Sequence, residues 1–301
     1  MPIRYNERKP LEDSASKHPS KTANFTFSEP VYTMDDMILS DAQRNALCEV
    51  IALIRYESLI FETWGLKRVI KRGTGFKVNL YGPPGVGKTM AAHAIAHELQ
   101  KPMLEVNYAE IESKYVGETS KNLVALFEKA KERDAILLLD EADALLSRRV
   151  SEMRGSADVS VNQTRSVLLR LLDEYRGICL FTTNFISNYD PAFMRRITKH
   201  IQFPLPDVTQ REKLWRHYLV SELPNNADSV KLAEKFDGIS GADIANAVLS
   251  AAVHSAYLGV SIVEQSFLES AVEDILQARK KNAGKEITVR EITGTGKEES
   301  L

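Results

Sequence analysis

The sequence predicts an α/β fold, in which a parallel five-stranded sheet carries helices on both faces and a small all-helical domain follows. Three patterns support this prediction. Short apolar runs are typical of strands, helical stretches alternate with most of them, and the chain after Pro206 shows helical periodicity alone. Alternation of strands and helices is typical of a parallel sheet covered on both faces. The 301 residues suffice for about two domains at roughly 150 residues each.

Residues 1–32 hold little apolar surface and are rich in Lys, Ser, Pro and Glu, so a flexible tail is expected there. A leading helix is expected over 40–63, with Ser40 as its N-cap. The α/β domain is expected to cover 33–206. Its predicted strands are Phe76–Tyr81, Met103–Asn107, Ala135–Asp140, Ile178–Thr183 and His200–Phe203, and its predicted helices are Lys88–Gln100, Thr119–Arg133 and Val161–Tyr175.

The pattern changes after Pro206, where only helical stretches follow, and residues 207–281 are expected to form a small helical lid. The predicted lid helices are Thr209–Val220, Ser229–Phe236, Gly241–Tyr257 and Val263–Lys280. Residues 282–301 are expected to be a polar, frayed tail.

Composition and charge exclude several functional classes. The 39 Lys and Arg nearly balance the 41 Asp and Glu, and the net charge of −2 offers no bulk attraction for nucleic acid. The apolar runs are far shorter than the ~20 residues that span a bilayer, so no membrane association is expected. The first residues lack the apolar segment of a signal peptide, and a cytoplasmic location is expected. Two cysteines are too few for a zinc site or a disulfide framework.

Residues 82–89, Gly-Pro-Pro-Gly-Val-Gly-Lys-Thr, match the phosphate-binding pattern G-x-x-x-x-G-K-[ST] between a predicted strand and a predicted helix. The glycines let successive backbone N–H groups converge on phosphate oxygens, and the helix N-terminus favours the same anion. Lys88 is expected to reach the β- and γ-phosphates of ATP, and Thr89 to coordinate Mg²⁺. The expected nucleotide contacts are Gly82, Pro83, Pro84, Gly85, Val86, Gly87, Lys88, Thr89 and Met90.

Asp140 and Glu141 follow the four aliphatic residues of another predicted strand, at the carboxyl end where such sheets bind ligands. Asp140 is expected to contribute to the Mg²⁺ shell. Glu141 is expected to polarise the water that attacks the γ-phosphate. Neighbouring side chains on a strand point to opposite faces, so both can reach one cleft only if the strand ends here. Asp143 is expected to start the next segment rather than to bind metal.

These residues together resemble the AAA+ ATPase family over about residues 33–278. Asn184, in Thr182-Thr183-Asn184, resembles sensor 1 of that family, which contacts the attacking water or the γ-phosphate. Arg195 and Arg196 resemble its arginine fingers, whose permanent charge and fork geometry suit phosphate oxygens. If these fingers act on a neighbouring subunit, the resemblance implies a ring, and specifically a hexamer.

Two further segments refine the resemblance. Residues 238–243, Gly-Ile-Ser-Gly-Ala-Asp, are similar to a motif of the AAA clade proper, and Gly241 and Ala242 are expected to lie against adenine and ribose. The lack of a sensor 2 arginine here favours the protein-remodelling group that includes katanin, spastin and fidgetin. Lys114, Tyr115 and Val116 resemble the aromatic pore loop 1 of that group, which grips an extended polypeptide by its aromatic face. Local packing of Tyr115 is the alternative.

The resemblance therefore implies an ATP-hydrolysing protein remodeller that acts as a homohexamer and threads a protein substrate. Minimal bacterial relatives that dismantle HORMA-domain signalling complexes share this layout, so a HORMA-domain protein is a narrower hypothesis for the client. The missing sensor 2 arginine counts against it. A DNA-associated AAA+ ATPase, such as a helicase loader or transposition ATPase, would need a basic surface with interleaved aromatics. A nucleotide-gated scaffold without turnover is the third hypothesis, and Glu141 with the paired arginines argues against it.

Overall fold

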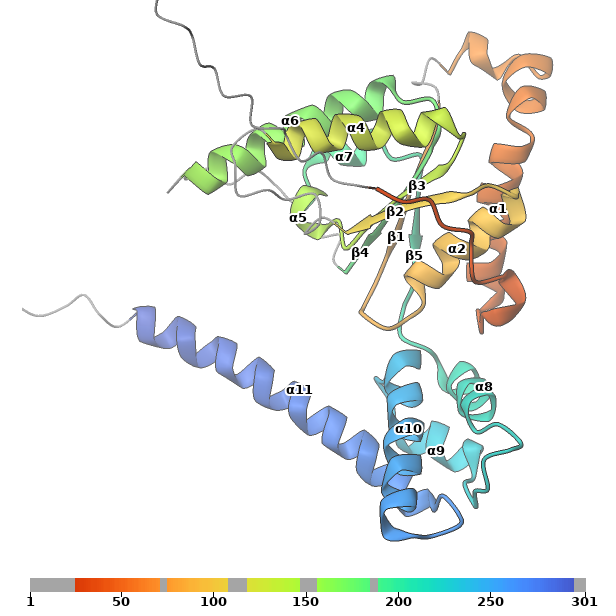
Figure 1. Ribbon diagram of the computed structural model, residues 1–301, viewed down its shortest axis with the longest axis vertical. Coiled ribbons are helices and arrows are strands. Elements are labelled where there is room, and N and C mark those ends of the chain that lie inside the picture. The colour runs from red at the N-terminus through yellow and green to blue at the C-terminus, as the bar shows by residue number, and fades with distance from the viewer. Residues whose placement is uncertain (1–24, 71–74, 108–117, 147–155, 185–188, 295–301) are drawn as a thin grey trace, which may run out of the picture.

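A computed structural model of the chain describes residues 25–70, 75–107, 118–146, 156–184 and 189–294 (Figure 1). A five-stranded sheet lies at its centre, in the order β2-β3-β4-β1-β5, and all neighbouring strands are parallel. This confirms the predicted fold class. The strands are β1 (Phe76–Tyr81), β2 (Met103–Asn107), β3 (Ile136–Asp140), β4 (Ile178–Thr183) and β5 (Lys199–Gln202).

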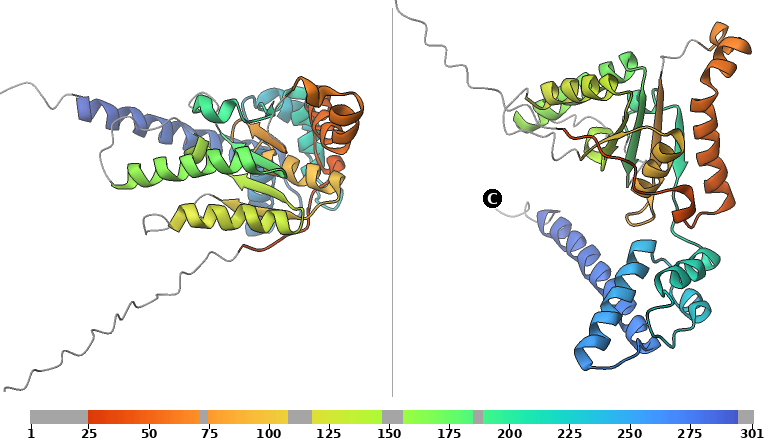
Figure 2. Two further views of the ribbon diagram at one scale, coloured as in Figure 1. Left: turned by 90° about the horizontal axis from the view of Figure 1, so that it is seen from above. Right: turned by 45° about the vertical axis from the view of Figure 1, so that its right-hand side comes forward.

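Helices cover both faces of the sheet, with α1 (Asp41–Arg55) and α2 (Lys88–Leu99) on one face and α4 (Glu118–Glu132) and α6 (Ser156–Glu174) on the other (Figures 1 and 2). Strand β3 shows why both faces need a cover. Its side chains alternate, so Ile136 and Leu138 pack with the α1–α2 layer, whereas Leu137 and Leu139 pack with the α4–α6 layer. All four are at most 1% exposed, and β3 therefore anchors both halves of the core.

The leading helix is shorter than predicted. Helix α1 begins after the N-cap Ser40, whose hydroxyl accepts from the Gln43 backbone N–H in a capping box, and it ends at Arg55. A π-helical turn at Leu59–Thr63 follows instead of a continuous helix to residue 63. The short α5 (Asp143–Leu146) and α7 (Pro191–Met194) were not expected from the apolar pattern.

Residues 25–32 correct the prediction of a tail that extends to residue 32. Ser28 exchanges backbone hydrogen bonds of 3.0 and 2.8 Å with Met103, and so extends the sheet beyond the edge strand β2 as an antiparallel bridge. Phe25 is buried in the core between the sheet and α4. The prediction was wrong because it weighed mean composition, whereas Phe25 and Phe27 pack in or against the core and anchor this segment.

The lid consists of α8 (Val208–Tyr218), α9 (Ser229–Lys235), α10 (Gly241–Leu258) and α11 (Gln265–Gly294). It has its own core, which includes Trp215, Leu232 and Leu268. Helix α11 continues through residues 282–294, where a frayed tail was predicted, and it projects away from the rest of the lid (Figures 1 and 2). None of the described helices is both long and apolar enough to cross a membrane.

Replacing Phe25 with alanine tests the docking of the N-terminal segment. Phe25 is 7% exposed, and deleting such a side chain should lower the free energy of unfolding by about 3 kcal/mol. Urea unfolding measures this loss. Val31→Ala is the control, because Val31 is 69% exposed and its truncation should change stability by less than about 0.5 kcal/mol. If the two variants are equally stable, residues 25–32 do not contribute to the folded core and the original prediction of a tail up to residue 32 is right.

Candidate active site

The phosphate-binding loop connects the end of β1 to the start of α2. Gly82 has φ +151°, and a Cβ atom there would lie 1.9 Å from the carbonyl oxygen of Phe203, so only glycine fits. The Gly82 N–H donates to the Thr183 carbonyl at 3.2 Å, which ties the loop to the end of β4. Gly87, at φ +93°, is the N-cap of α2 and leads directly into Lys88.

Lys88 lies inside the curve of this loop. Its Nζ donates to the carbonyl oxygens of Gly82 and Pro83, both at 2.8 Å, and to Oδ1 of Asn184 at 3.0 Å. Burial lowers the pKa of Lys88, and the nearby Asp143, Asp140 and Glu141 oppose that shift. The structure thus brings the predicted Asn184 next to the predicted phosphate-binding lysine. Pro84 and Gly85 are exposed at the tip of the loop.

Thr89 and Asp140 supply oxygen atoms on the other side of the loop. The Thr89 hydroxyl donates to Asp140 at 3.2 Å to Oδ1 and 3.4 Å to Oδ2. Asp140 Oδ1 also accepts a hydrogen bond from the Thr182 hydroxyl. A hydroxyl and a carboxylate are the oxygen ligands that Mg²⁺ prefers beside phosphates. Their proximity fits the Mg²⁺ site predicted for these two residues.

Glu141 turns toward the same cleft because the strand ends before it. Its φ of +51° is left-handed, an uncommon conformation that costs about 1 kcal/mol or more for a residue other than glycine. The Glu141 N–H donates to the Thr182 hydroxyl at 3.0 Å, and the Ala142 N–H donates to the Thr182 carbonyl at 3.0 Å. These contacts stabilise the turn after β3. Because the strand ends at Asp140, Asp140 and Glu141 need not point to opposite faces of the sheet as neighbours within a strand would.

Asn107 is a site residue that the sequence reasoning missed. Its Nδ2 donates to Oε2 of Glu141 at 2.9 Å, and in the sheet it pairs with Asp140 across β2 and β3. The sequence feature that could have identified it is a polar residue at the carboxyl end of β2, the strand next to β3. Asp143 begins α5, as predicted, and its carboxylate also accepts from the Asn184 N–H at 3.0 and 3.1 Å.

A small pocket of about 80 Å³ lies beside the phosphate-binding loop, where the core and the lid meet. Four residues predicted for nucleotide contact line it: Val86, Gly87, Met90 and Gly241. Ala242 is adjacent, since its N–H donates to the Gly85 carbonyl at 3.1 Å. The lining of the pocket combines apolar residues such as Ile38 with polar ones such as Gln43 and His217, a mixture that suits the face and the polar edge of an aromatic base. The sequence reasoning missed the rest of its lining, namely Asp36, Met37, Ile38, Leu39, Gln43, Pro204, Pro206, Gln210, Leu214, His217 and Tyr218.

The predicted arginine fingers lie far from this cleft. The Thr198 N–H, just after them, donates to the carbonyl of Lys77 at the start of β1, whereas the phosphate-binding loop follows the end of that strand. A strand of six residues is about 20 Å long. Arg196 forms an ion pair with Asp173 at 2.7–2.8 Å. Arg195 is exposed and its side chain has no hydrogen bond or ion pair with the described residues. Neither arginine is placed to reach Lys88 of its own chain.

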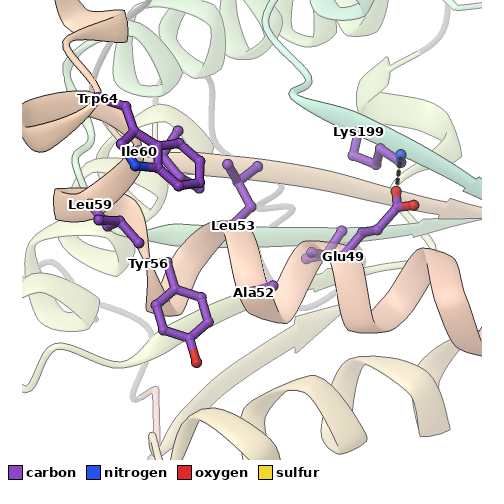
Figure 3. A pocket seen from close by; sticks show the side chains of 9 residues that line it. Glu49, Ala52, Leu53, Tyr56, Leu59, Ile60, Trp64 and Lys199 are labelled. Atoms are coloured by element: carbon purple, nitrogen blue, oxygen red, sulfur yellow. Dashed lines mark hydrogen bonds and ion pairs between the residues drawn. The ribbon is translucent and has the colours of Figure 1, made fainter.

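Lys114, Tyr115 and Val116, the predicted pore loop, lie outside the described residues. A second pocket, of about 440 Å³, is bordered by α1, by the π-helical turn that follows it and by Lys199 of β5 (Figure 3). It is mainly apolar, and Trp64 and Tyr56 contribute to its lining. The ion pair between Glu49 and Lys199, at 2.8 Å, is at one end.

Comparison with known proteins agrees with this geometry. Residues 78–205 match the ATPase family associated with various cellular activities (AAA). The chain is 34% identical over 243 residues to the 26S proteasome regulatory subunit 8 homolog of Saccharomyces cerevisiae, an alignment that covers 78% of this chain and 58% of the relative. It is 32% identical over 260 residues to the 26S proteasome regulatory subunit 8 homolog B of Arabidopsis thaliana, which covers 84% of this chain and 60% of the relative.

A third relative, the 26S proteasome regulatory subunit 8 of Dictyostelium discoideum, is 32% identical over 245 residues, with 79% of this chain and 59% of the relative covered. The chain thus spans about three fifths of the length of these curated relatives. The matched region contains most of β1, the phosphate-binding loop, the acidic pair and Asn184. Residues 78–205 of this chain are therefore an AAA ATPase domain.

Proposed function

We propose that this chain is an ATP-hydrolysing protein remodeller, or unfoldase, that works as a homohexameric ring in the cytoplasm. The observation that carries the proposal is the convergence of four groups on the phosphate-binding loop: Lys88, Asn184, the Thr89–Asp140 pair and Glu141. Phosphoryl transfer requires little more than positioning and charge stabilisation. This cleft offers a cation, an amide, an oxygen pair for a metal and a carboxylate base.

Each group has a distinct task in the proposed hydrolysis. Lys88 leaves the Gly82 and Pro83 carbonyls to donate to the β- and γ-phosphates, and Asn184 moves with it as a donor near the γ-phosphate. Thr89 and Asp140 would hold Mg²⁺, which when bound neutralises charge on the phosphate oxygens. Glu141 orients the attacking water and accepts its proton. Asn107, through its 2.9 Å hydrogen bond, fixes the direction of the Glu141 carboxylate.

The position of the arginines supports a ring. Arg195 and Arg196 lie about one strand length from the phosphate-binding loop of their own chain. An arginine that stabilises transition-state charge must touch the phosphate, so these residues would have to act on the nucleotide of a neighbouring copy. Arg195 is the better placed of the two, because its guanidinium has no ion pair among the described residues, whereas Arg196 would first have to leave Asp173. A head-to-tail contact of this kind closes into a ring.

Protein is the substrate class that the comparisons favour. The relatives carry the descriptions of proteasome regulatory subunits, and the proteasome acts on proteins. We propose that Tyr115, with Lys114 and Val116, grips the polypeptide. A HORMA-domain client remains a narrower proposal. The DNA-associated alternative is disfavoured by the net charge of −2, and the scaffold without turnover is disfavoured by the intact Glu141.

Glu141→Gln tests hydrolysis and the substrate class together. Removing the base should lower kcat for ATP at least about 100-fold, while nucleotide binding persists because Lys88 and Thr89 are unchanged. The exposed Glu132→Gln is the matched control and should hydrolyse ATP normally. With ATP present, Glu141→Gln should retain its client, and mass spectrometry of the co-purified material should find protein. Undiminished turnover contradicts the assignment of the base, and recovery of nucleic acid alone overturns the remodelling proposal.

Asn107→Ala tests the orientation of the base. A hydrogen bond to a charged group contributes about 1.5 kcal/mol or more. Losing that free energy from the orientation of the Glu141 carboxylate should lower kcat about tenfold, with little change in the KM for ATP. Steady-state phosphate release measures both constants. Asn45→Ala, at an exposed position of α1, is the control. A variant as active as the Asn45 control would show that Asn107 has no part in positioning Glu141.

Tyr115→Ala tests the grip on polypeptide. Fluorescein-labelled casein serves as an unfolded probe, and its anisotropy should report binding to the Glu141→Gln protein with ATP. Removing an aromatic anchor should weaken casein binding about tenfold or more, while Tyr115→Ala alone should retain ATPase activity within about twofold. Tyr56→Ala, at an exposed tyrosine far from the cleft, is the control. Unchanged casein binding, or tight binding of labelled single-stranded DNA instead, would refute the pore-loop assignment.

A further inference from the structure

An ion pair joins the long helix α11 to the turn that begins α10. Nη2 of Arg279, on α11, lies 2.6 and 2.5 Å from the two carboxylate oxygens of Asp243, and its Nη1 lies 3.5 Å from the carbonyl oxygen of Gly238. The Asp243 side chain is 10% exposed, whereas that of Arg279 is 44% exposed. A partly exposed arginine thus neutralises a nearly buried carboxylate.

The same carboxylate shapes the turn. Oδ2 of Asp243 accepts from the Ser240 N–H and from the Ser240 hydroxyl, both at 2.7 Å, and the Asp243 N–H donates back to that hydroxyl at 3.3 Å. This reciprocal capping box fixes the backbone of residues 240–243. The orientation of the Asp243 carboxylate therefore determines where Gly241 and Ala242 lie.

Residues 240–243 also contact the phosphate-binding loop. The Ala242 N–H donates to the Gly85 carbonyl at 3.1 Å. A Cβ atom added at Gly85 would lie 2.6 Å from the Ser240 hydroxyl oxygen and 2.8 Å from Cβ of Ala242. Gly85 is the middle of the loop that would surround the phosphates, so a shift of the turn changes the support of that loop directly.

We propose that Arg279 is a positioning residue for the nucleotide site. Through Asp243 it holds the lid turn against Gly85, and so the placement of α11 sets the affinity of the core for nucleotide. This inference rests on the nucleotide binding proposed above. The pair is not needed to fold the lid, whose core is formed by Trp215, Leu232, Leu268 and their neighbours. A half-exposed ion pair contributes little to stability, yet it lies at the junction between lid and loop.

The arrangement also gives α11 a mechanical connection to the cleft. The helix packs on α10 near its start and then projects beyond the lid (Figure 1). Arg279 stands where α11 passes the Gly238–Asp243 turn. A displacement of the projecting part of α11 would reach the phosphate-binding loop through two side chains.

Binding of a fluorescent ADP analogue, mant-ADP, with Mg²⁺ tests the proposal, in parallel with ATPase kinetics. Arg279→Ala should raise the Kd for mant-ADP and the KM for ATP about fivefold each. This is the low end of the effect that one site in a protein typically has on ligand affinity at another. Its kcat at saturating ATP should stay within about twofold. Arg279→Lys should recover at least half of the lost affinity. The neighbouring exposed Lys280→Ala is the matched control and should bind as the wild-type chain does.

A double-mutant cycle separates positioning from general destabilisation. Asp243→Asn should weaken nucleotide binding, and adding Arg279→Ala in that background should cause no further loss, because both act through one path. Additive losses, or Arg279→Ala binding as tightly as Lys280→Ala, would overturn the inference and leave the proposed function intact. A wild-type chain that binds no mant-ADP would instead refute the proposed function and this inference with it. The Arg279→Ala and Lys280→Ala variants should unfold at the same midpoint temperature. Unfolding of the lid in Arg279→Ala would show instead that the Arg279–Asp243 ion pair serves to stabilise the lid, and would overturn the inference.

Discussion

The parallel pairing of β3, β4 and β1 is the constraint on which the candidate site depends. Parallel strands bring their carboxyl ends to one edge, and the pairing of Tyr81 with Thr183 aligns the starts of the loops that follow them. Thr182 links the end of β4 to the end of β3 at this edge. Its hydroxyl bonds Asp140 and the Glu141 N–H, and its carbonyl accepts from Ala142. Residues at the ends of two neighbouring strands thus fix the geometry of the acidic pair.

Close packing at the end of the sheet adds a second requirement. Gly82 fits against the Phe203 carbonyl only because it has no side chain, so the same contact that shapes the phosphate-binding loop also fixes the end of β5. From Phe203 the chain enters the lid, and Gly85 meets the lid again through Ala242. The loop is therefore placed between the covalent entry to the lid and a non-covalent contact with it. Core and lid cannot shift relative to one another without a change at the loop.

The sequence predicted those parts whose signal is local. The strands were placed within one residue, because each is a buried apolar run bounded by turn residues, and the phosphate-binding loop has a fixed spacing. The contact of Asn107 with Glu141 could not be predicted, since it depends on which strands are neighbours. The pairing of Arg196 with Asp173, and that of Arg279 with Asp243, joins residues more than twenty positions apart and leaves no periodic trace. Residues 25–32 were misjudged because the packing of Phe25 and Phe27 against the core outweighs the polar average of the segment.

The segment between core and lid has a consequence for how force would travel through the molecule. Pro204 and Pro206 stand on either side of Leu205, and each proline ring locks φ near −65°. Such a connection is stiffer than a flexible linker and transmits displacements between core and lid more directly. The two fixed φ angles leave fewer backbone dihedrals about which the lid can rotate relative to the core. The small pocket beside the phosphate-binding loop, which Pro204 and Pro206 both line, adjoins this connection, so a rotation there would change the shape of the pocket.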